Sequence, residues 1–245
     1  GIGFTSLGFS KVEVMKGPSS IMFGADALGG VLYFMDEPFE KNSKYKINYN
    51  SFYESNNRYF NNQISTKWSN DNFRINAYAE YGKSSDYQLP SVGYLYNSRF
   101  ENKAIKVIMG YSKNRWLINA KYQLNDNFVG IPGHSHESAP TLEDLTSNTS
   151  FRHKTRPAQF ITNQIANIEN TYLLNKSKLK LDLSYTLNEL REYEAWTVPE
   201  IDLDLSTNQW NLRWYKEIKE NIKLTIGTQG SNQYTRNQSA RTQLL

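Results

Sequence analysis

The sequence contains no cysteine and only three histidines among its 245 residues. Disulfide frameworks and thiolate metal sites are therefore excluded, and a metal site would have to be built mainly from carboxylates. No stretch approaches the ~18 consecutive apolar residues that a membrane-spanning helix needs. The N-terminal sequence "GIGFTSLGFS" also lacks the basic start and the apolar run of a signal peptide.

An excess of one charge is also missing. The 28 basic and 24 acidic residues give a net charge of +4 and are spread almost evenly, without the run of about five like charges that marks a nucleic-acid-binding arm. Hydrophobic residues make up 38% of the chain, below the usual range of about 45–50%. Aromatic residues nevertheless reach 14%, which is too many for a disordered chain. The composition indicates a folded protein without a large core and without a nucleic-acid partner.

What the chain has in abundance is the period-two alternation of apolar and polar residues that is typical of β-strands. In "KLKLDLSYTLN" (178–188), leucine and tyrosine occupy one face and lysine, aspartate, serine, threonine and asparagine the other. Helical periodicity is not convincing anywhere. The pattern predicts nine strands, near residues 44–55, 58–69, 72–86, 101–113, 115–128, 159–174, 177–194, 202–216 and 221–236.

Counting from the second strand, the connections between these strands alternate in length. Tight polar turns such as "SNDN" (69–72) alternate with long connections at about 86–100, 129–158 and 195–201. Trp68, Trp116 and Trp214 lie near the short turns, while Tyr53, Tyr193, Trp196 and Tyr234 lie toward the opposite strand ends. Outer-membrane barrels have short periplasmic turns, longer extracellular loops and two aromatic bands at headgroup depth. The pattern therefore predicts a transmembrane antiparallel β-barrel. An antiparallel sandwich with aromatics in its core is the alternative, but its strands would be unusually long.

A glycine-rich stretch precedes the strands. In "SKVEVMKGPSSIMFGADALGGVLYFMDEP" (10–38), "KVEVMK" and "VLYFM" are short strands, and the glycines between them allow positive φ or close backbone approach. Taken alone, the stretch predicts a tight loop between two buried strands. A phosphate-binding loop is not favoured, because the lysine and the following serine or threonine of a P-loop are missing.

This stretch resembles the end of the plug domain of TonB-dependent outer-membrane receptors. The pattern runs from Val12 to Val31 and includes the turn residues Gly17, Pro18, Gly24, Gly29 and Gly30. The resemblance implies an all-β chain in which 1–40 is the C-terminal part of a plug domain and 41–245 is the N-terminal part of a transmembrane β-barrel. About nine of the ~22 strands of such a plugged barrel would be present. We therefore expect an internal fragment, since neither a TonB box nor a closing aromatic strand is found.

The resemblance implies a transporter and not an enzyme. Such receptors sit in the outer membrane of Gram-negative bacteria and import a scarce solute with energy from the TonB complex. A ferric siderophore or another iron chelate is the expected solute, with no resident cofactor or metal. TonB would contact a segment outside this chain, and outer-membrane lipid is the other expected partner. Importers of cobalamin, haem or oligosaccharides, a passive porin or adhesin-type barrel, and a soluble β-rich binding module are the alternatives.

In this family, solute contacts come from the plug apex and from the extracellular loops. The apex would correspond to "IMFGADALGG", with Phe23 and Asp26, although Asp26 could simply cap the turn. The loop at 129–158 supplies His134, His136, Arg152, His153 and Arg156, which would suit an anionic chelate if they are not merely solvated. The two histidines at 134 and 136 could alternatively contact a metal or haem. Six inward basic residues either line the lumen, which we favour for most, or bind plug carboxylates: Lys46, Arg74, Lys106, Lys121, Lys178 and Lys180.

Overall fold

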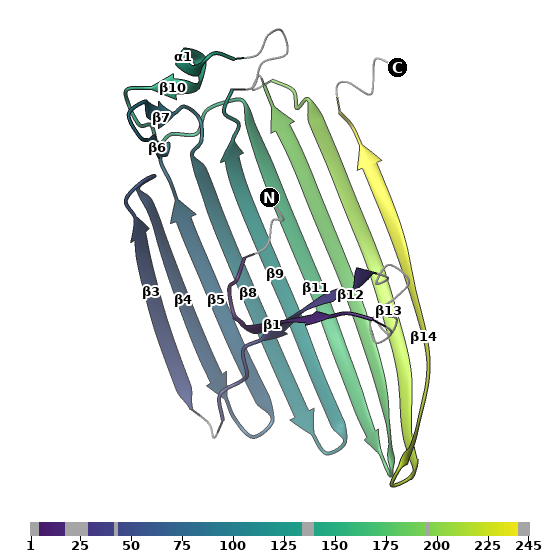
Figure 1. Cartoon of the computed structure of the whole chain (residues 1–245). Coiled ribbons are helices and arrows are strands. Elements are labelled where there is room, and N and C mark those ends of the chain that lie inside the picture. The colour runs from purple at the N-terminus through teal and green to yellow at the C-terminus, as the bar shows by residue number, and fades with distance from the viewer. Residues whose placement is uncertain (1–4, 18–28, 42–43, 134–139, 195–196, 240–245) are drawn as a thin grey trace.

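The computed structural model describes residues 5–17, 29–41, 44–133, 140–194 and 197–239 (Figure 1). In this part of the chain, nine long strands form one antiparallel sheet, and each long strand pairs with the long strand that follows it in the sequence. They are β3 (Tyr45–Glu54), β4 (Tyr59–Ser69), β5 (Phe73–Lys83), β8 (Phe100–Lys113), β9 (Trp116–Gly130), β11 (Ala158–Leu174), β12 (Ser177–Tyr193), β13 (Ile201–Lys219) and β14 (Ile222–Asn237).

All nine predicted strands are confirmed, with boundaries that differ by a few residues. The largest differences are at β5, which ends at Lys83 rather than at 86, and at β13, which continues to Lys219 rather than ending at 216. From β4 onward, the long connections lie at one end of the sheet and the short turns at the other (Figure 1). The predicted alternation of loop lengths therefore describes the two ends of the sheet.

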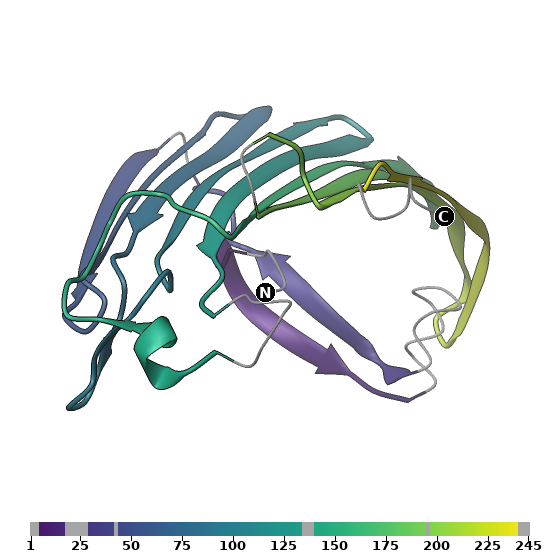
Figure 2. The ribbon, with the colours of Figure 1, turned by 90° about the horizontal axis from the view of Figure 1, so that it is seen from above.

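The sheet curls into an arc, and the N-terminal segment lies on its concave side (Figure 2). We call the concave side the inner face and the convex side the outer face. In β12, Leu179, Leu183 and Tyr185 point to the outer face and are well exposed, while Lys180 and Asp182 belong to the inner face. Other exposed apolar side chains of the outer face are Ile64, Ile105, Met109, Ile168, Trp210 and Ile226. The convex surface is therefore apolar and, in the described part of the chain, exposed.

Aromatic side chains pair across strands near both ends of the outer face. Near the short turns, Phe73 and Tyr111 have ring centroids 4.8 Å apart, and Trp116 and Tyr172 are 4.6 Å apart. Toward the long loops, the rings of Phe128 and Phe160 lie edge to face at 5.4 Å. These contacts give the two aromatic bands that the sequence predicts; Trp196 lies outside the described residues.

The glycine-rich stretch forms a hairpin of β1 (Phe9–Met15) and β2 (Val31–Asp36), which crosses the inner face of the sheet (Figure 1). The prediction of two strands is confirmed, and they pair with each other, whereas residues 18–28 of the predicted loop lie outside the described residues. The prediction that the two strands are buried is wrong. Val14 and Leu32 are each 61% exposed, because the hairpin contacts the sheet mainly through the residues just before β1 and at the end of β2.

The long loops contain short elements that the sequence did not predict. β6 (Gln88–Leu89) and β7 (Gly93–Leu95) come from the first long loop, and β10 (Thr146–Ser147) from the second pairs with β7. One helical turn, α1 (Leu142–Leu145), precedes β10 and begins with a capping box between Thr141 and Asp144. Hydrogen bonds from Thr141 lower the pKa of the Asp144 carboxyl. No helix in the described residues is long and apolar enough to cross a membrane.

Candidate functional site

Two consecutive carboxylates at the end of β2 attach the hairpin to the inner face of the sheet. Asp36 accepts an ion pair from Lys106 Nζ at 2.6 Å on one oxygen and from Lys121 Nζ at 2.9 Å on the other. Glu37 pairs with Lys67 Nζ at 2.6 Å. We call these five residues the hairpin anchor. They join β2 to three strands of the sheet, β4, β8 and β9.

Lys106 is the most buried member of the hairpin anchor, with its side chain 0% exposed. Besides Asp36, its ammonium group donates to the carbonyl oxygens of Leu7 (3.2 Å) and Gly8 (3.3 Å). The ring of Phe9 lies 3.3 Å from the same nitrogen, at cation–π distance. A buried ammonium is tolerated only when such partners replace its water.

A small apolar cluster supports the hairpin anchor. Leu7 packs with Tyr78, Ala104 and Ile108, and Phe39 adjoins them. Gly8 has φ +66°, and a Cβ added there would lie 2.8 Å from the Tyr78 ring. Glycine is thus required both by the backbone conformation and by the close approach of the ring.

The anchor decides between the two interpretations of the inward basic residues. Lys106 and Lys121 bind a carboxylate of the N-terminal segment, so lumen lining is the wrong interpretation for these two. Lys180 instead pairs with Asp182 of its own sheet at 3.3 Å, and Lys178 lies over the ring of Tyr215. Arg74 stacks on Phe39, with its guanidinium carbon 5.3 Å from the ring centroid.

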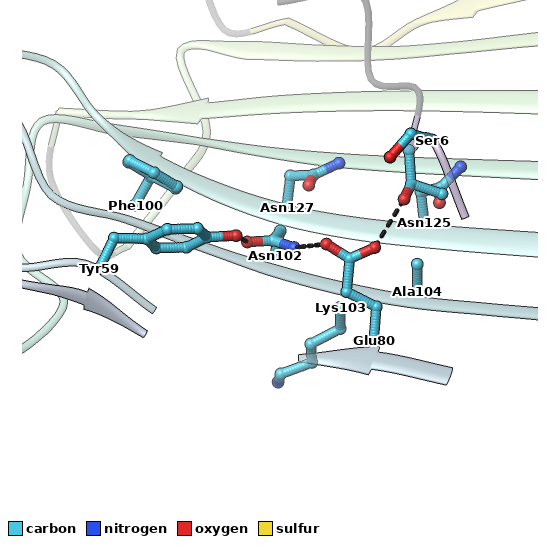
Figure 3. A pocket seen from close by; sticks show the side chains of 10 residues that line it. Ser6, Tyr59, Glu80, Phe100, Asn102, Lys103, Ala104, Asn125 and Asn127 are labelled. Carbon is cyan, nitrogen blue, oxygen red and sulfur yellow. Dashed lines mark hydrogen bonds between the residues drawn. The ribbon is translucent and has the colours of Figure 1, made fainter. Parts of the chain in front are cut away.

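A polar cavity of about 330 Å³ lies beside the anchor, between the N-terminal segment and the inner faces of β4, β5, β8 and β9 (Figure 3). The Glu80 carboxylate is its main acceptor: it receives hydrogen bonds from Asn61 (2.8 Å), Asn102 (2.8 Å) and Thr5 Oγ1 (2.7 Å). Tyr59 donates to the Asn102 amide oxygen at 2.8 Å.

One lining residue of this cavity has unused hydrogen-bonding capacity. Asn125 is 2% exposed, and neither its amide nitrogen nor its amide oxygen has a partner among the described residues. An amide in such a position requires water or another polar group in the cavity. Among the described residues, no group of three or more histidine, aspartate or glutamate side chains could hold a metal ion. The cavity can bind polar groups, and it presents no arrangement for bond chemistry.

The glycines that carry the family resemblance are described only in part. Gly30 (φ +118°) has the positive φ that the sequence allows, and a Cβ there would lie 2.7 Å from the Met15 carbonyl oxygen. Gly17, in the predicted turn, also has a positive φ, of +84°. Gly29 is described but does not have a positive φ. Pro18 and Gly24 lie outside the described residues, as do the candidate solute-binding residues Phe23, Asp26, His134 and His136.

Arg152, His153 and Arg156, the remaining candidates, lie in the segment that leads into β11. Arg152 donates to the carbonyl oxygen of Lys83 at 3.1 Å, and the carbonyl oxygen of His153 accepts from Arg99 at 3.1 Å. Arg156 is half-buried just before β11. Arg152 thus contacts the end of β5, and His153 contacts Arg99 just before β8. A role in solute binding stays a prediction for all three residues.

A buried ion pair that the sequence did not reveal lies within the first long loop and also binds the second, since Phe151 N donates to Asp86 Oδ2 at 3.2 Å. Arg99 Nε donates to Asp86 Oδ1 at 2.9 Å, and the two side chains are 1% and 0% exposed. The guanidinium also lies against the rings of Tyr96 and Phe151, with centroids at 5.1 and 5.5 Å. Asp86 and Arg99 are 13 residues apart in a loop, so no periodic pattern could have indicated their contact.

Solved structures share this arrangement of sheet and hairpin. The FrpB iron transporter from Neisseria meningitidis superposes with a TM-score of 0.73 at 14% identity over 94% of this chain. A ferric enterobactin receptor variant from Pseudomonas aeruginosa (PfeA), in complex with enterobactin, gives 0.70 at 11% over 96%. The ferric citrate transporter FecA gives 0.64 at 14% over 92%. The chain has the fold of TonB-dependent outer-membrane receptors.

The likeness covers only part of each receptor. The chain spans 38% of the length of the FrpB and PfeA structures and 34% of the FecA structure. No family model matches the sequence, and no curated protein matches it. The predicted fold class, an antiparallel β-barrel wall with a preceding N-terminal element, is confirmed, whereas the identities are too low to carry over any residue's role.

Proposed function

We propose that this chain is part of a TonB-dependent receptor of the Gram-negative outer membrane that imports a scarce solute, namely a ferric siderophore or another iron chelate. Residues 1–40 would be the end of the plug and residues 41–245 the first part of the barrel, about nine of ~22 strands. The long loops would face the outside and the short turns the periplasm.

One observation carries the proposal: a hairpin is held by partly buried ion pairs on the concave polar face of a sheet whose convex face is apolar. A passive pore needs an open lumen, whereas the hairpin anchor fixes a folded element across it. A soluble sheet would not leave an apolar convex face exposed over so many strands. Solved structures with the same fold are iron transporters and receptors by name, which supports the choice of iron chelates.

The proposal is tested by growth of a strain lacking the full-length gene. On iron-depleted medium, we expect the deletion to abolish growth on one ferric chelate among several supplied singly, and the gene supplied in trans to restore it. Uptake of the same chelate labelled with ⁵⁵Fe should stop when TonB is removed. Haem, cobalamin and oligosaccharides supplied as sole sources of iron, cobalamin or carbon test the alternative solutes. Uptake that continues without TonB would indicate a passive pore.

A further inference from the structure

Three lysines surround a single carboxylate near the long-loop end of the sheet. Lys154 Nζ lies 3.0 Å and Lys103 Nζ 3.3 Å from one oxygen of Glu101, and Lys83 Nζ lies 3.3 Å from the other. The Glu101 side chain is only 8% exposed, whereas those of Lys103 and Lys154 are 51% and 35% exposed. We call Lys83, Lys103 and Lys154 the lysine cluster. Each ammonium has three donors, so one carboxylate leaves most of them unused.

The lysine cluster belongs to the outer face of the sheet. Glu101 is opposite Lys83 on β5 and opposite Phe128 on β9. Its neighbour Asn102 points the other way, into the polar cavity of the inner face (Figure 3). Two residues beyond Lys103 on the same face, Ile105 is 43% exposed and belongs to the apolar surface. The cluster therefore lies at the border between that surface and the long loops.

Aromatic rings accompany the lysines. Lys154 Nζ lies 5.1 Å from the centroid of the Phe128 ring and 5.8 Å from that of Phe160. Aromatic side chains at a barrel's interface sit at headgroup depth. Lysines beside them extend their ammonium groups toward the polar side of the interface. The same depth is where the phosphates of a lipid monolayer lie.

The positive charge of this region is only partly neutralised. Arg152, whose guanidinium binds the Lys83 carbonyl oxygen, adds a fourth basic group. The second carboxylate nearby is Asp126, the cross-strand partner of Lys103, which accepts from Thr162 Oγ1 at 3.2 Å. Four basic groups and two carboxylates leave a net charge of +2. An anion with several acceptor oxygens is the matching ligand.

We propose that the lysine cluster binds phosphate groups of anionic lipid headgroups in the outer leaflet of the membrane. The proposal rests on the outer-membrane placement given above. Glu101 holds the three ammonium groups at fixed positions, and the exposed Lys103 and Lys154 supply donors to the phosphate. Lys154 belongs to the basic segment that the sequence suggested for solute binding. Its contacts instead fasten the second long loop to the rim of the sheet at the membrane surface.

The test uses the full-length protein in nanodiscs of phosphatidylcholine containing diphosphorylated lipid A. Retained lipid A is quantified by native mass spectrometry and compared with its dephosphorylated form. The wild type should enrich the phosphorylated form. A basic residue near an anionic surface changes binding about fivefold, so Lys103→Gln with Lys154→Gln should reduce retention about 25-fold. Raising the salt concentration should weaken the wild-type interaction.

Lys113→Gln is the matched control, because Lys113 is exposed on the same strand and the same face but at the short-turn end. It should change retention less than about twofold. If the double variant does not fold, Lys103→Gln alone keeps two lysines on Glu101 and should still lose about fivefold. Equal retention of both lipid A forms, or unchanged retention in the variants, overturns the proposal.

Inorganic phosphate separates the two possible sources of the ligand. If millimolar phosphate displaces lipid A from the wild type and binds in its place, the site is one for free anions and the lipid assignment is wrong. Persistence of lipid A under the same conditions supports the lipid. Uptake of ⁵⁵Fe chelate is measured on separate samples, so a failure of the import function would not be mistaken for a failure of lipid binding.

Discussion

Replacing Asp36 by asparagine tests whether the hairpin anchor holds the hairpin on the sheet. The change removes the negative charge that Lys106 and Lys121 share. Removing one partner of a buried ion pair costs about 3–5 kcal/mol, because the other charge stays buried. Lys106 is fully buried but keeps two carbonyl partners, and Asp36 itself is 26% exposed. We therefore expect about 3 kcal/mol, the lower end of that range.

Hydrogen exchange of the backbone amides in β1 and β2 measures this cost in the full-length protein. A loss of about 3 kcal/mol in the opening free energy corresponds to exchange about 100-fold faster in the hairpin. Amides in the central strands of the sheet should keep their rates. Asp71→Asn, which removes an exposed carboxylate in a short turn, is the control and should leave hairpin exchange within about twofold.

A double-mutant cycle shows whether the buried charge of Lys106 is the source of the effect. Lys106→Met replaces the ammonium by an apolar group of similar length. In that background, Asp36→Asn should cost less than about 1 kcal/mol, since only the partly exposed contact with Lys121 is lost. An equal cost of Asp36→Asn in both backgrounds, or hairpin exchange accelerated less than about threefold in the wild-type background, would refute this reasoning.

Three further changes test other contacts. Gly8→Ala should speed hairpin exchange about tenfold or more, because the positive φ and the Tyr78 ring both oppose a Cβ; an unchanged rate would contradict the fit. Arg99→Gln leaves the buried Asp86 carboxylate without its cation, at a cost of about 3 kcal/mol. Trypsin should therefore cleave the loop at 131–157 faster, by up to about 100-fold. Equal cleavage of variant and wild type would show that the pair does not stabilise the contact between the loops. Asn125→Leu should leave the melting temperature unchanged or higher, since its amide has no partner among the residues that the structure describes; a clear decrease would indicate a tightly bound water.

The long strands could be predicted because their signal is local. Side chains alternate between the two faces of any strand, and here each face meets a different environment over ten to nineteen residues. The positions where the strands end depend on contacts with residues far away in the sequence. The sequence predicts that β5 continues to 86. Ser84 N still donates to Phe100 O in the register of the β5–β8 ladder, but the backbone then leaves it, since Ser85 N donates to Asn57 O and Asp86 N to Phe151 O. These partners are far away in the sequence, so no window around Ser84 indicates them.

The loop elements could not be predicted for the same reason. β10 exists because Thr146 lies opposite Leu95, a residue that belongs to the other long loop. The loop that contains Lys154 is a candidate for solute contacts because of its length, its basic residues and the family resemblance. Lys154 of this loop lies at the outer face because the carboxylate that it pairs with, that of Glu101, is on the outer face of β8.

The inner-face lysines show what strand register adds to strand pattern. Alternation places Lys106 and Lys180 on the same face and cannot distinguish them. The ladder pairs Lys67 with Asn76, Asn76 with Ile108, and Ile108 with Lys121, so two lysines distant in sequence share one row across four strands. Lys106 is two residues from Ile108 on the same strand face. An acidic pair at the end of β2 that reaches this row meets three ammonium groups at once, whereas Lys180 finds its carboxylates within its own sheet. Register together with the "MDEP" sequence at 35–38 would therefore have located the hairpin anchor.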